Sequence, residues 1–532
     1  MNCNYSRMNR TYTVVFVCLL ASCAMAQSKK KVAPERLINI DFNVEKGPLN
    51  TMFKECVGAG RANEGLRTDW QQQLAYVRKE CGFKYIRMHG LLTDDMAVYA
   101  QDKNGNPQYN YMYVDVLFDF LHSIGMKPFV ELGFMPSQLA SGNKTIFWWR
   151  GNVTPPKDHE KWAALITNLV QHFTERYGEA EVKTWYFEVW NEPNLDGFWA
   201  GSQAEYFKLY NYSANAIKKV NPSYRVGGPG TAGAAWESEM IDYCIKNATP
   251  IDFISTHAYG VKQGYLDEFG NSGTVLDKNP MSIIGDVLDS RKEISASSKP
   301  NLELHYTEWS ASYTPADPIH DSYHEAAFVL QKLKQVGDAA NSMSYWVFTD
   351  IFEEAGPRFT PFHGGFGMLN TQGINKPVFY AYQFMNRLGN TELTNRDQSS
   401  WVCKDEEGNV QAVVWDFTNT HPGDSVNNQR YYVRDLPSKA KPKVKLDITH
   451  IPAGTYALEI YKVGYRSNDA YSTYLSMGKP AQLTKLQVEH IKRQNDGAPF
   501  LKEIVSIKAG SVFSRELDTR ENDVFFLNLV KL

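Results

Sequence analysis

Two glutamates, far apart in the chain, each follow a short run of β-forming residues. Glu192 lies in the Trp-Asn-Glu-Pro-Asn motif of residues 190–194, and Glu308 lies in the Tyr-Thr-Glu-Trp motif of residues 306–309. Hydrolysis of a glycosidic bond needs two carboxyl groups: one protonates the leaving oxygen, and the other attacks or assists at the anomeric carbon. The two motifs therefore predict a glycosidase.

Pro193 constrains the backbone conformation that we expect at Glu192. Proline disfavours the helical conformation in the residue that precedes it. We therefore expect the Glu192 carboxylate to leave an extended strand end instead of folding back as a helix cap.

The elements that must position these motifs alternate between strand-like and helical stretches from residue 51 to residue 389, as in parallel βα units. A capping box at Ser202–Glu205 begins one helix, and Asn221-Pro222 ends it. The eight predicted strands are residues 54–58, 85–89, 128–133, 185–190, 224–227, 253–257, 302–306 and 344–348. They predict a (β/α)8 TIM barrel, lengthened by loop insertions.

The chain changes character at about residue 390. Strand-like runs separated by turn residues, with no helical periodicity of comparable length, predict an antiparallel β-sandwich accessory domain over residues 390–532. Its predicted strands include residues 410–417, 430–433, 456–463 and 523–529. Residues 37–44, within an N-terminal segment of residues 27–50, have no barrel partner and are expected to add a strand to this sandwich.

The barrel interpretation predicts that functional side chains gather at the carboxyl ends of the strands. Polar and aromatic residues at these positions include His89, Asn191, His257, Tyr259, Glu308, Trp346, Glu353 and Glu354. For several of them a structural role is the alternative. A histidine at a strand end often only donates a structural hydrogen bond, and Trp346 either forms the floor of the site or packs in the top of the barrel. Of Glu353 and Glu354, we expect one to contact a sugar hydroxyl.

Two other patterns are rejected as sites. The Gly-x-Gly-x-x-Gly pattern of residues 228–233 contains Pro229, which removes a backbone donor that a nucleotide phosphate needs. His320 and His324 have the spacing of a metal-binding helix turn, but no third ligand is identifiable. We predict no cofactor, no metal and no nucleotide.

The charge balance excludes other partners. The 532 residues carry 56 basic and 59 acidic side chains, a formal net charge of -3. Neither nucleic-acid binding nor membrane-surface binding is indicated by this balance.

The N-terminus predicts export. Arg7 and Arg10 precede the apolar run of residues 14–21, and residues 24–26 offer a small-x-small cleavage site, so residues 1–26 are interpreted as a signal peptide. The protein is then periplasmic or extracellular. The alternative is a membrane-anchored lipoprotein, because Cys23 ends a Leu-Ala-Ser-Cys sequence that resembles a lipobox. Four cysteines lie outside this region (Cys56, Cys81, Cys244 and Cys403), and we expect buried free thiols.

The long motifs, taken in order, resemble those of glycoside hydrolase family 39, and most closely its bacterial β-xylosidase branch. The resemblance runs from about Gly82 to Gly389; the α-L-iduronidase branch is more distant. The segments that carry it are residues 186–194, 306–309, 344–348, 352–354 and 363–367, leading into Lys376-Pro377. Ser310 departs from the pattern, because family xylosidases carry Asn there, and this bears on the fine positioning of the site and on its sugar preference.

The resemblance implies a retaining mechanism, with Glu192 as acid/base and Glu308 as nucleophile. It also implies substrate contacts from His89, Asn191, His257, Tyr259, Tyr313, Trp346, Glu353 and Glu354. The expected activity is that of an exo-acting β-xylosidase. Alternatives are a relative specific for an arabinopyranoside, galactoside or uronide, a transglycosylase, and a non-catalytic glycan-binding protein. A retaining mechanism predicts carboxyl groups about 5–5.5 Å apart and a Glu192 pKa raised by the nearby charge of Glu308.

Overall fold

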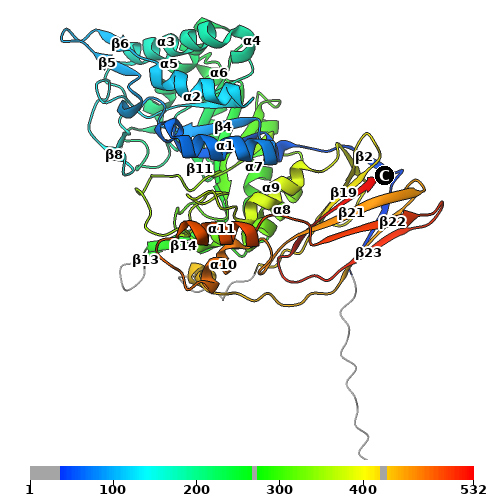
Figure 1. Cartoon of the computed structure of the whole chain (residues 1–532). Helices are drawn as coiled ribbons and strands as arrows, with labels where there is room; N and C mark the ends of the chain where they lie inside the picture. The colour runs from blue at the N-terminus through cyan, green and yellow to red at the C-terminus, as the bar shows by residue number, and fades with distance from the viewer. Residues whose placement is uncertain (1–35, 267–271, 420–427) are drawn as a thin grey trace, which may run out of the picture.

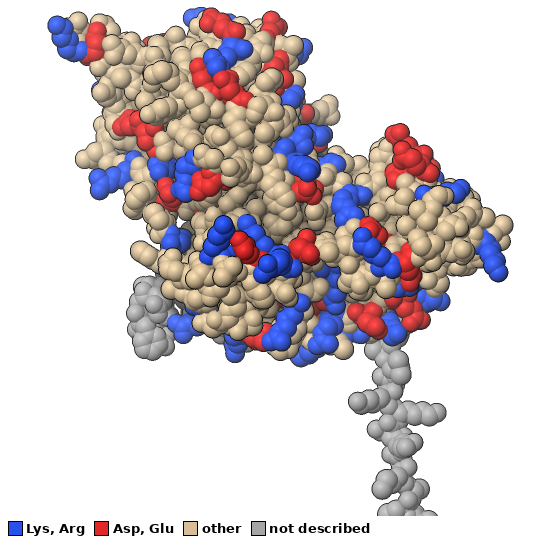
Figure 2. All heavy atoms as spheres, viewed as in Figure 1, with Lys and Arg blue, Asp and Glu red and all other residues tan. Residues whose placement is uncertain are grey.

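The structure, a computed structural model, describes residues 36–266, 272–419 and 428–532. The predicted signal peptide, Cys23 and residues 27–35 lie outside the described residues. Within the described part of the chain, no helix has both the length and the apolar character required to cross a membrane. Acidic and basic side chains are interspersed over the face shown in Figure 2.

Eight parallel strands form a closed barrel, which confirms the predicted TIM barrel. Each predicted barrel strand overlaps an observed one. In barrel order the strands are β3 (Cys56–Arg61), β4 (Tyr85–His89), β7 (Lys127–Leu132), β10 (Tyr186–Val189), β11 (Arg225–Ala232), β12 (Phe253–Tyr259), β15 (Glu303–Ser310) and β16 (Ser342–Tyr345).

Helices surround this barrel and bury its outer face. They are α1 (Thr68–Cys81), α2 (Met112–Ser123), α3 (His159–Tyr177), α4 (Glu179–Val182), α5 (Gln203–Val220), α6 (Glu237–Lys246), α7 (Ile284–Ala296), α8 (His324–Val336) and α9 (Pro377–Asn386). Helix α5 begins with the predicted capping box, in which the Ser202 side chain accepts from Glu205 N–H and the Glu205 carboxylate accepts from Ser202 N–H. Asn221 follows its last turn as predicted.

Inserted hairpins explain why the barrel segment is longer than usual. All three lie in loops that follow barrel strands. They are β5 (Tyr99–Gln101) with β6 (Pro107–Tyr109), β8 (Thr145–Ile146) with β9 (Gly151–Asn152), and β13 (Val261–Leu266) with β14 (Ser272–Leu276).

The second unit consists of two sheets that enclose an apolar core. The three-stranded sheet has the order β1 (Arg36–Asp41), β20 (Val444–Thr449) and β23 (Phe513–Leu517). The seven-stranded sheet has the order β2 (Glu45–Pro48), β17 (Thr391–Leu393), β18 (Ser400–Lys404), β19 (Val410–Trp415), β24 (Val524–Lys531), β21 (Gly454–Val463) and β22 (Leu501–Ile507). Strand β1 pairs in parallel with β20, so an N-terminal strand is part of the C-terminal sandwich.

Two expectations for this unit were wrong. Residues 430–433, predicted as a strand, belong to the 3-10 helix η5 (Asn428–Val433). Two helices, α10 (Ala470–Ser476) and α11 (Lys485–Gln494), lie between β21 and β22, where no helix was predicted. In α11 only Ile491 is buried, so its sequence lacks a broad apolar face. Both helices pack on Phe362 and Ile374 of a barrel loop, and Figure 1 shows them away from the sandwich strands. The four cysteines, by contrast, are buried free thiols as predicted.

Candidate active site

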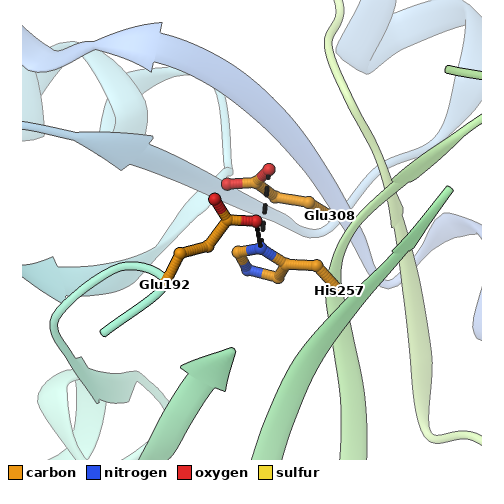
Figure 3. Close-up of side chains that lie close together, drawn as sticks. All are labelled: Glu192, His257 and Glu308. Carbon is orange, nitrogen blue, oxygen red and sulfur yellow. Dashed lines mark hydrogen bonds and ion pairs between the residues drawn. The ribbon is translucent and has the colours of Figure 1, made fainter. Parts of the chain in front are cut away.

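Glu192, His257 and Glu308 meet at the carboxyl end of the barrel strands (Figure 3). His257 Nδ1 lies 2.9 Å from Glu192 Oε1 and 3.6 Å from Glu308 Oε2. One oxygen of each carboxyl group and the His257 nitrogen all lie within 4.8 Å of one another. Inverting glycosidases separate their carboxyl groups by about 6.5–9.5 Å to admit a water molecule, whereas retaining enzymes hold them about 5–5.5 Å apart. An oxygen–oxygen distance of at most 4.8 Å is shorter than the inverting range, and it favours a retaining pair.

The backbone at Glu192 corrects the expectation of an extended strand end. Strand β10 stops at Val189, and Trp190 and Glu192 have positive φ angles of 74° and 46°. Such angles are uncommon for residues other than glycine and are maintained by surrounding structure. Here Glu192 N–H donates to Gly230 O in β11 at 2.8 Å. This contact with the neighbouring strand, which proline chemistry alone does not predict, sets the turn that presents the carboxyl group.

Both oxygens of Glu308 accept short hydrogen bonds. Arg87 Nη1 donates to Oε1 at 2.6 Å, and the Tyr259 hydroxyl donates to Oε2 at 2.6 Å. Burial and the adjacent Glu308 raise the pKa of Tyr259 well above its ordinary value, so its hydroxyl remains a donor. These contacts fix the carboxylate in one orientation toward the cavity.

Arg87 joins Glu308 to two further buried glutamates that sequence reasoning missed. Its Nε donates to Glu188 Oε2 at 2.6 Å, and its Nη2 lies 3.0 Å from Glu131 Oε2. Burial opposes a charge on Arg87, but the surrounding carboxylates outweigh it and raise its pKa. Nη2 also donates to Asn191 Oδ1 at 2.9 Å, which leaves the Asn191 amide NH2 to donate to a ligand. A glutamate inside an apolar barrel strand is the signal by which Glu131 and Glu188 could have been found.

Glu131 also orients His89. Its Oε2 lies 2.6 Å from His89 Nδ1, and the other ring nitrogen then lies 3.5 Å from Glu308 Oε1 and 3.6 Å from Glu354 Oε1. Burial opposes ionisation of Glu131, but the charges of His89 and Arg87 outweigh it, so the pKa of Glu131 is lowered. His89 therefore presents its Nε2 edge to the cavity.

Glu192 and His257 have the protonation states that acid catalysis needs. Burial raises the pKa of Glu192 to about 7, against the opposing charges of His89 and Arg87. The direction is the predicted one, but the cause is different: burial dominates, and Glu131 is the carboxylate that adds to the shift. Burial lowers the pKa of His257 to about 4, so its ring is neutral when Glu192 begins to ionise.

These side chains open into a cavity of about 610 Å³. Six of the predicted contact residues line it: His89, Asn191, Tyr259, Tyr313, Trp346 and Glu354. His257 contacts both catalytic candidates from β12. Sequence reasoning missed the apolar lining residues, chiefly Leu195, Phe198, Val261 and Phe366. A volume of this size is typical of a site for a small molecule.

The two adjacent glutamates after β16 point in different directions. Glu354 lines the cavity, and burial raises its pKa well above the ordinary value. Glu353 instead forms ion pairs with Arg61 at 2.9 Å and Arg67 at 3.1 Å. The structure thus places only Glu354 of this pair at the cavity.

Three positions that the sequence analysis discussed without assigning them to the site have structural surroundings. Ser310 is buried and donates to Ser312 O at 2.8 Å, so it acts on the loop before Tyr313 and not on a ligand. His320 Nδ1 lies 2.9 Å from Gly364 O, and His324 Nδ1 lies 2.7 Å from Ser322 Oγ. The Gly-x-Gly-x-x-Gly pattern forms part of β11 and its end, not a loop that opens a helix.

Glu192, His257 and Glu308 are also close enough together to hold a cation. Donors from Arg87 and Tyr259 already occupy both oxygens of Glu308, however. The arrangement therefore suits two carboxyl groups that are each held by hydrogen bonds to neighbouring protein groups.

A closed (β/α)8 barrel with two close carboxyl groups at its mouth defines a glycosidase of the retaining type. The family model of glycosyl hydrolases family 39 matches residues 36–509, and the chain belongs to this family.

Several known proteins are similar to this chain over most of its length. The chain is 39% identical over 467 residues to a β-xylosidase of Caldicellulosiruptor saccharolyticus, which covers 86% of this chain and 91% of the relative. A crystal structure of the family 39 enzyme from Xanthomonas axonopodis pv. citri has a TM-score of 0.92 at 41% identity, covering 95% of this chain and 99% of that one. A monomeric β-xylosidase from Caulobacter crescentus CB15 has a TM-score of 0.90 at 40% identity, covering 93% and 100%.

The iduronidase branch is more distant, as the motifs predicted. Human α-L-iduronidase is 28% identical over 223 residues, which cover 40% of this chain and 32% of the relative.

Proposed function

We propose that this protein is a retaining, exo-acting β-xylosidase that releases terminal xylose from β-xylosides or xylo-oligosaccharides. The observation that carries the proposal is the close pair formed by Glu192 and Glu308, in a chain that resembles β-xylosidases over most of its length. Glu308 attacks the anomeric carbon while protonated Glu192 donates to the leaving oxygen. The covalent ester is then hydrolysed by a water molecule that Glu192, now ionised, activates.

The surrounding groups support each step. Arg87 and Tyr259 hold Glu308 in line for attack, and His257 holds Glu192 at 2.9 Å. Asn191 faces the cavity as a donor to sugar hydroxyls, and His89 presents its Nε2 edge to them. A hydrogen bond to the 2-hydroxyl strengthens in the oxocarbenium-like transition state, and Asn191, anchored by Arg87, is placed to make it.

The lining favours a pentoside over a uronide. Among the described residues that line the cavity, none is Lys or Arg, which a uronate carboxylate requires as a partner. Trp346 and Phe366 form an apolar wall that offers no hydrogen-bond acceptor to an exocyclic hydroxyl. A xylosyl ring, which has no exocyclic arm, suits this wall best.

A panel of p-nitrophenyl glycosides tests the proposal. The β-D-xyloside is expected to be the best substrate, and NMR of the first product is expected to show β-xylose, the retained anomer. With xylotetraose, xylose and xylotriose are expected from the first turnover, without xylobiose. Release of α-xylose, or no turnover of any glycoside, would contradict the mechanism. Release of chromophore also separates an enzyme from a non-catalytic glycan-binding protein.

We also propose that the protein acts outside the cytoplasm. The support is the N-terminal sequence, with Arg7, Arg10 and the apolar run of residues 14–21. Fractionation of cells that express the wild type and Cys23→Ser tests the mode of export. A membrane-bound wild type and a released Cys23→Ser variant indicate a lipid anchor, whereas equal release of both indicates cleavage after Ala26. Retention of both in the cytoplasm would contradict export.

A further inference from the structure

A glycine-rich loop, residues 363–367, carries Phe366 to the cavity wall. Three buried side chains hold its backbone. Gly364 N–H donates to Asp321 Oδ2 at 2.6 Å, Gly367 N–H donates to Asp350 Oδ1 at 2.7 Å, and Gly365 O accepts from Lys376 Nζ at 2.8 Å. The residues on both sides of Phe366 are therefore fixed by hydrogen bonds that its own segment does not supply.

Lys376, Asp321 and Asp350 form one ion cluster, the Lys376 clamp. Lys376 Nζ lies 2.7 Å from Asp321 Oδ1 and 2.6 Å from Asp350 Oδ2, and the Lys376 side chain is fully buried. Buried ion pairs are often no more stabilising than apolar residues of the same size, and their best-attested role is to fix one arrangement. The three residues come from separate parts of the barrel: the 3-10 helix η4 (Pro318–Asp321), the loop after β16, and the residue before α9.

The glycines of the loop are required by this clamp. A Cβ atom at Gly365 would collide with the Asp350 carboxylate, and one at Gly367 would collide with the backbone of Thr349 and Asp350. Gly364 has φ +75° and meets the backbone of residues 316–317. The loop can approach the buried charges this closely only without side chains.

Phe366 faces the cavity from this loop. Its side chain is buried, and its ring packs edge-on against Phe352 at 5.3 Å. Together with Trp346 and Val347 these rings form one apolar cluster, of which Trp346 and Phe366 line the cavity. The position of the loop backbone therefore sets how far this wall extends toward a bound sugar.

We propose that the Lys376 clamp positions Phe366, and that Phe366 is a specificity-determining residue that confines the sugar site to pentosides. The inference rests on the proposed β-xylosidase function. Lys376 is a positioning residue, because it reaches the substrate only through Phe366. A merely structural role for the cluster would lower stability and affect all substrates alike, whereas positioning changes the choice between substrates.

The test compares kcat/KM for p-nitrophenyl β-D-glucoside and β-D-xyloside, which differ by one exocyclic hydroxymethyl group. Phe366→Leu and Lys376→Met are expected to raise the glucoside-to-xyloside ratio at least about tenfold, because a pocket discriminates a group of this size by about 10–200-fold. Lys332→Met is the matched control. Lys332 is also a buried lysine, but its Nζ donates to Pro280 O at 2.8 Å, away from the loop. It is expected to leave the ratio unchanged.

Lys376→Met leaves two buried aspartates unpaired and so risks misfolding. A second variant therefore tests the same positioning role without removing a charge. Gly365→Ala displaces the loop by its added methyl group but keeps all three charges, and it is expected to raise the ratio as well. The Phe366→Leu/Lys376→Met double variant is expected to show no larger ratio than Phe366→Leu alone, because both act on one wall.

The outcomes test the specificity role of Phe366 and the positioning role of Lys376 separately. If Phe366→Leu folds and keeps the wild-type ratio, the specificity role is overturned. If Phe366→Leu raises the ratio but neither Lys376→Met nor Gly365→Ala does so, the positioning role is overturned. A wild type that prefers the glucoside overturns the proposed function together with this inference, whereas a xyloside-preferring wild type with unchanged variants overturns the inference alone.

Discussion

Replacement of Glu192 by alanine separates its two roles. The variant lacks the proton donor and leaves a space beside His257 Nδ1, which lies 2.9 Å from Glu192 Oε1 in the wild type. General acid catalysis contributes about 10²–10⁴-fold, or about 3–5 kcal/mol of barrier. Glycosylation is expected to slow by this factor for xylobiose, whose leaving group needs a proton. It is expected to change little for 2,4-dinitrophenyl β-D-xyloside, whose leaving group does not.

The pH profile gives a second measure of the same group. Because burial raises the Glu192 pKa to about 7, the proton needed for catalysis is present below pH 7 and is lost above it. In the wild type, kcat/KM for xylobiose is therefore expected to fall about tenfold per pH unit above pH 7. In Glu192→Ala the alkaline limb near pH 7 is expected to disappear.

The assay is stopped-flow release of dinitrophenolate followed by azide rescue. The variant is expected to show a burst, because water is no longer activated and the ester on Glu308 accumulates. Azide fits the space left by the carboxyl group, needs no base, and is expected to speed turnover and yield β-xylosyl azide. Glu192→Gln is the control that fills this space, so azide is expected to help it less. Absence of a burst and of azide rescue, with an unchanged alkaline limb, would refute the assignment of Glu192.

Three other changes test the site. Glu308→Ala is expected to abolish turnover of every glycoside, including activated ones, by steady-state assay; residual burst kinetics would argue against its role as nucleophile. Glu131→Gln is expected to move the alkaline limb to lower pH, because Glu131 contributes to the raised Glu192 pKa; an unmoved limb in a folded variant would contradict this. Glu192→Gln is expected to stabilise the fold at pH 8 but not at pH 4, seen as a higher Tm. The rise of the Glu192 pKa from 4.5 to about 7 means that the fold loses stability as pH increases across that interval, by about 3 kcal/mol in total. Equal Tm values of the wild type and Glu192→Gln at pH 8 would refute this expected loss of stability.

The barrel could be predicted because its strands are short apolar runs that end in polar residues. The pattern placed β4 at Tyr85–His89, and it located Glu192, His257 and Glu308 at strand ends that a barrel brings together. Closure of the barrel brings these side chains together, since the parallel strands end on the same rim.

The residues that were missed act through contacts between distant segments. Glu131 and Glu188 owe their roles to Arg87, which lies on a different strand. The positive φ at Glu192 is held by a bond to Gly230, and no local propensity encodes it. Helix α10 has only seven residues and α11 buries only Ile491, so neither shows a long helical periodicity in the sequence. A local sequence pattern identifies the residues of one segment but not the distant residues that they contact. These features depend on such distant contacts.

Strand β1 has a consequence for how the protein is made. It lies at the start of the described chain but hydrogen-bonds to β20, so this strand leaves the ribosome more than four hundred residues before its partner. The entire barrel is synthesised in between. A shortened gene that ends after α9 would leave Ile38 and Ile40, which are buried in the sandwich core, exposed to water. Sandwich residues such as Trp415 and Phe526 also belong to the large core cluster of the barrel, so such a shortened chain would lose part of the barrel's own core as well.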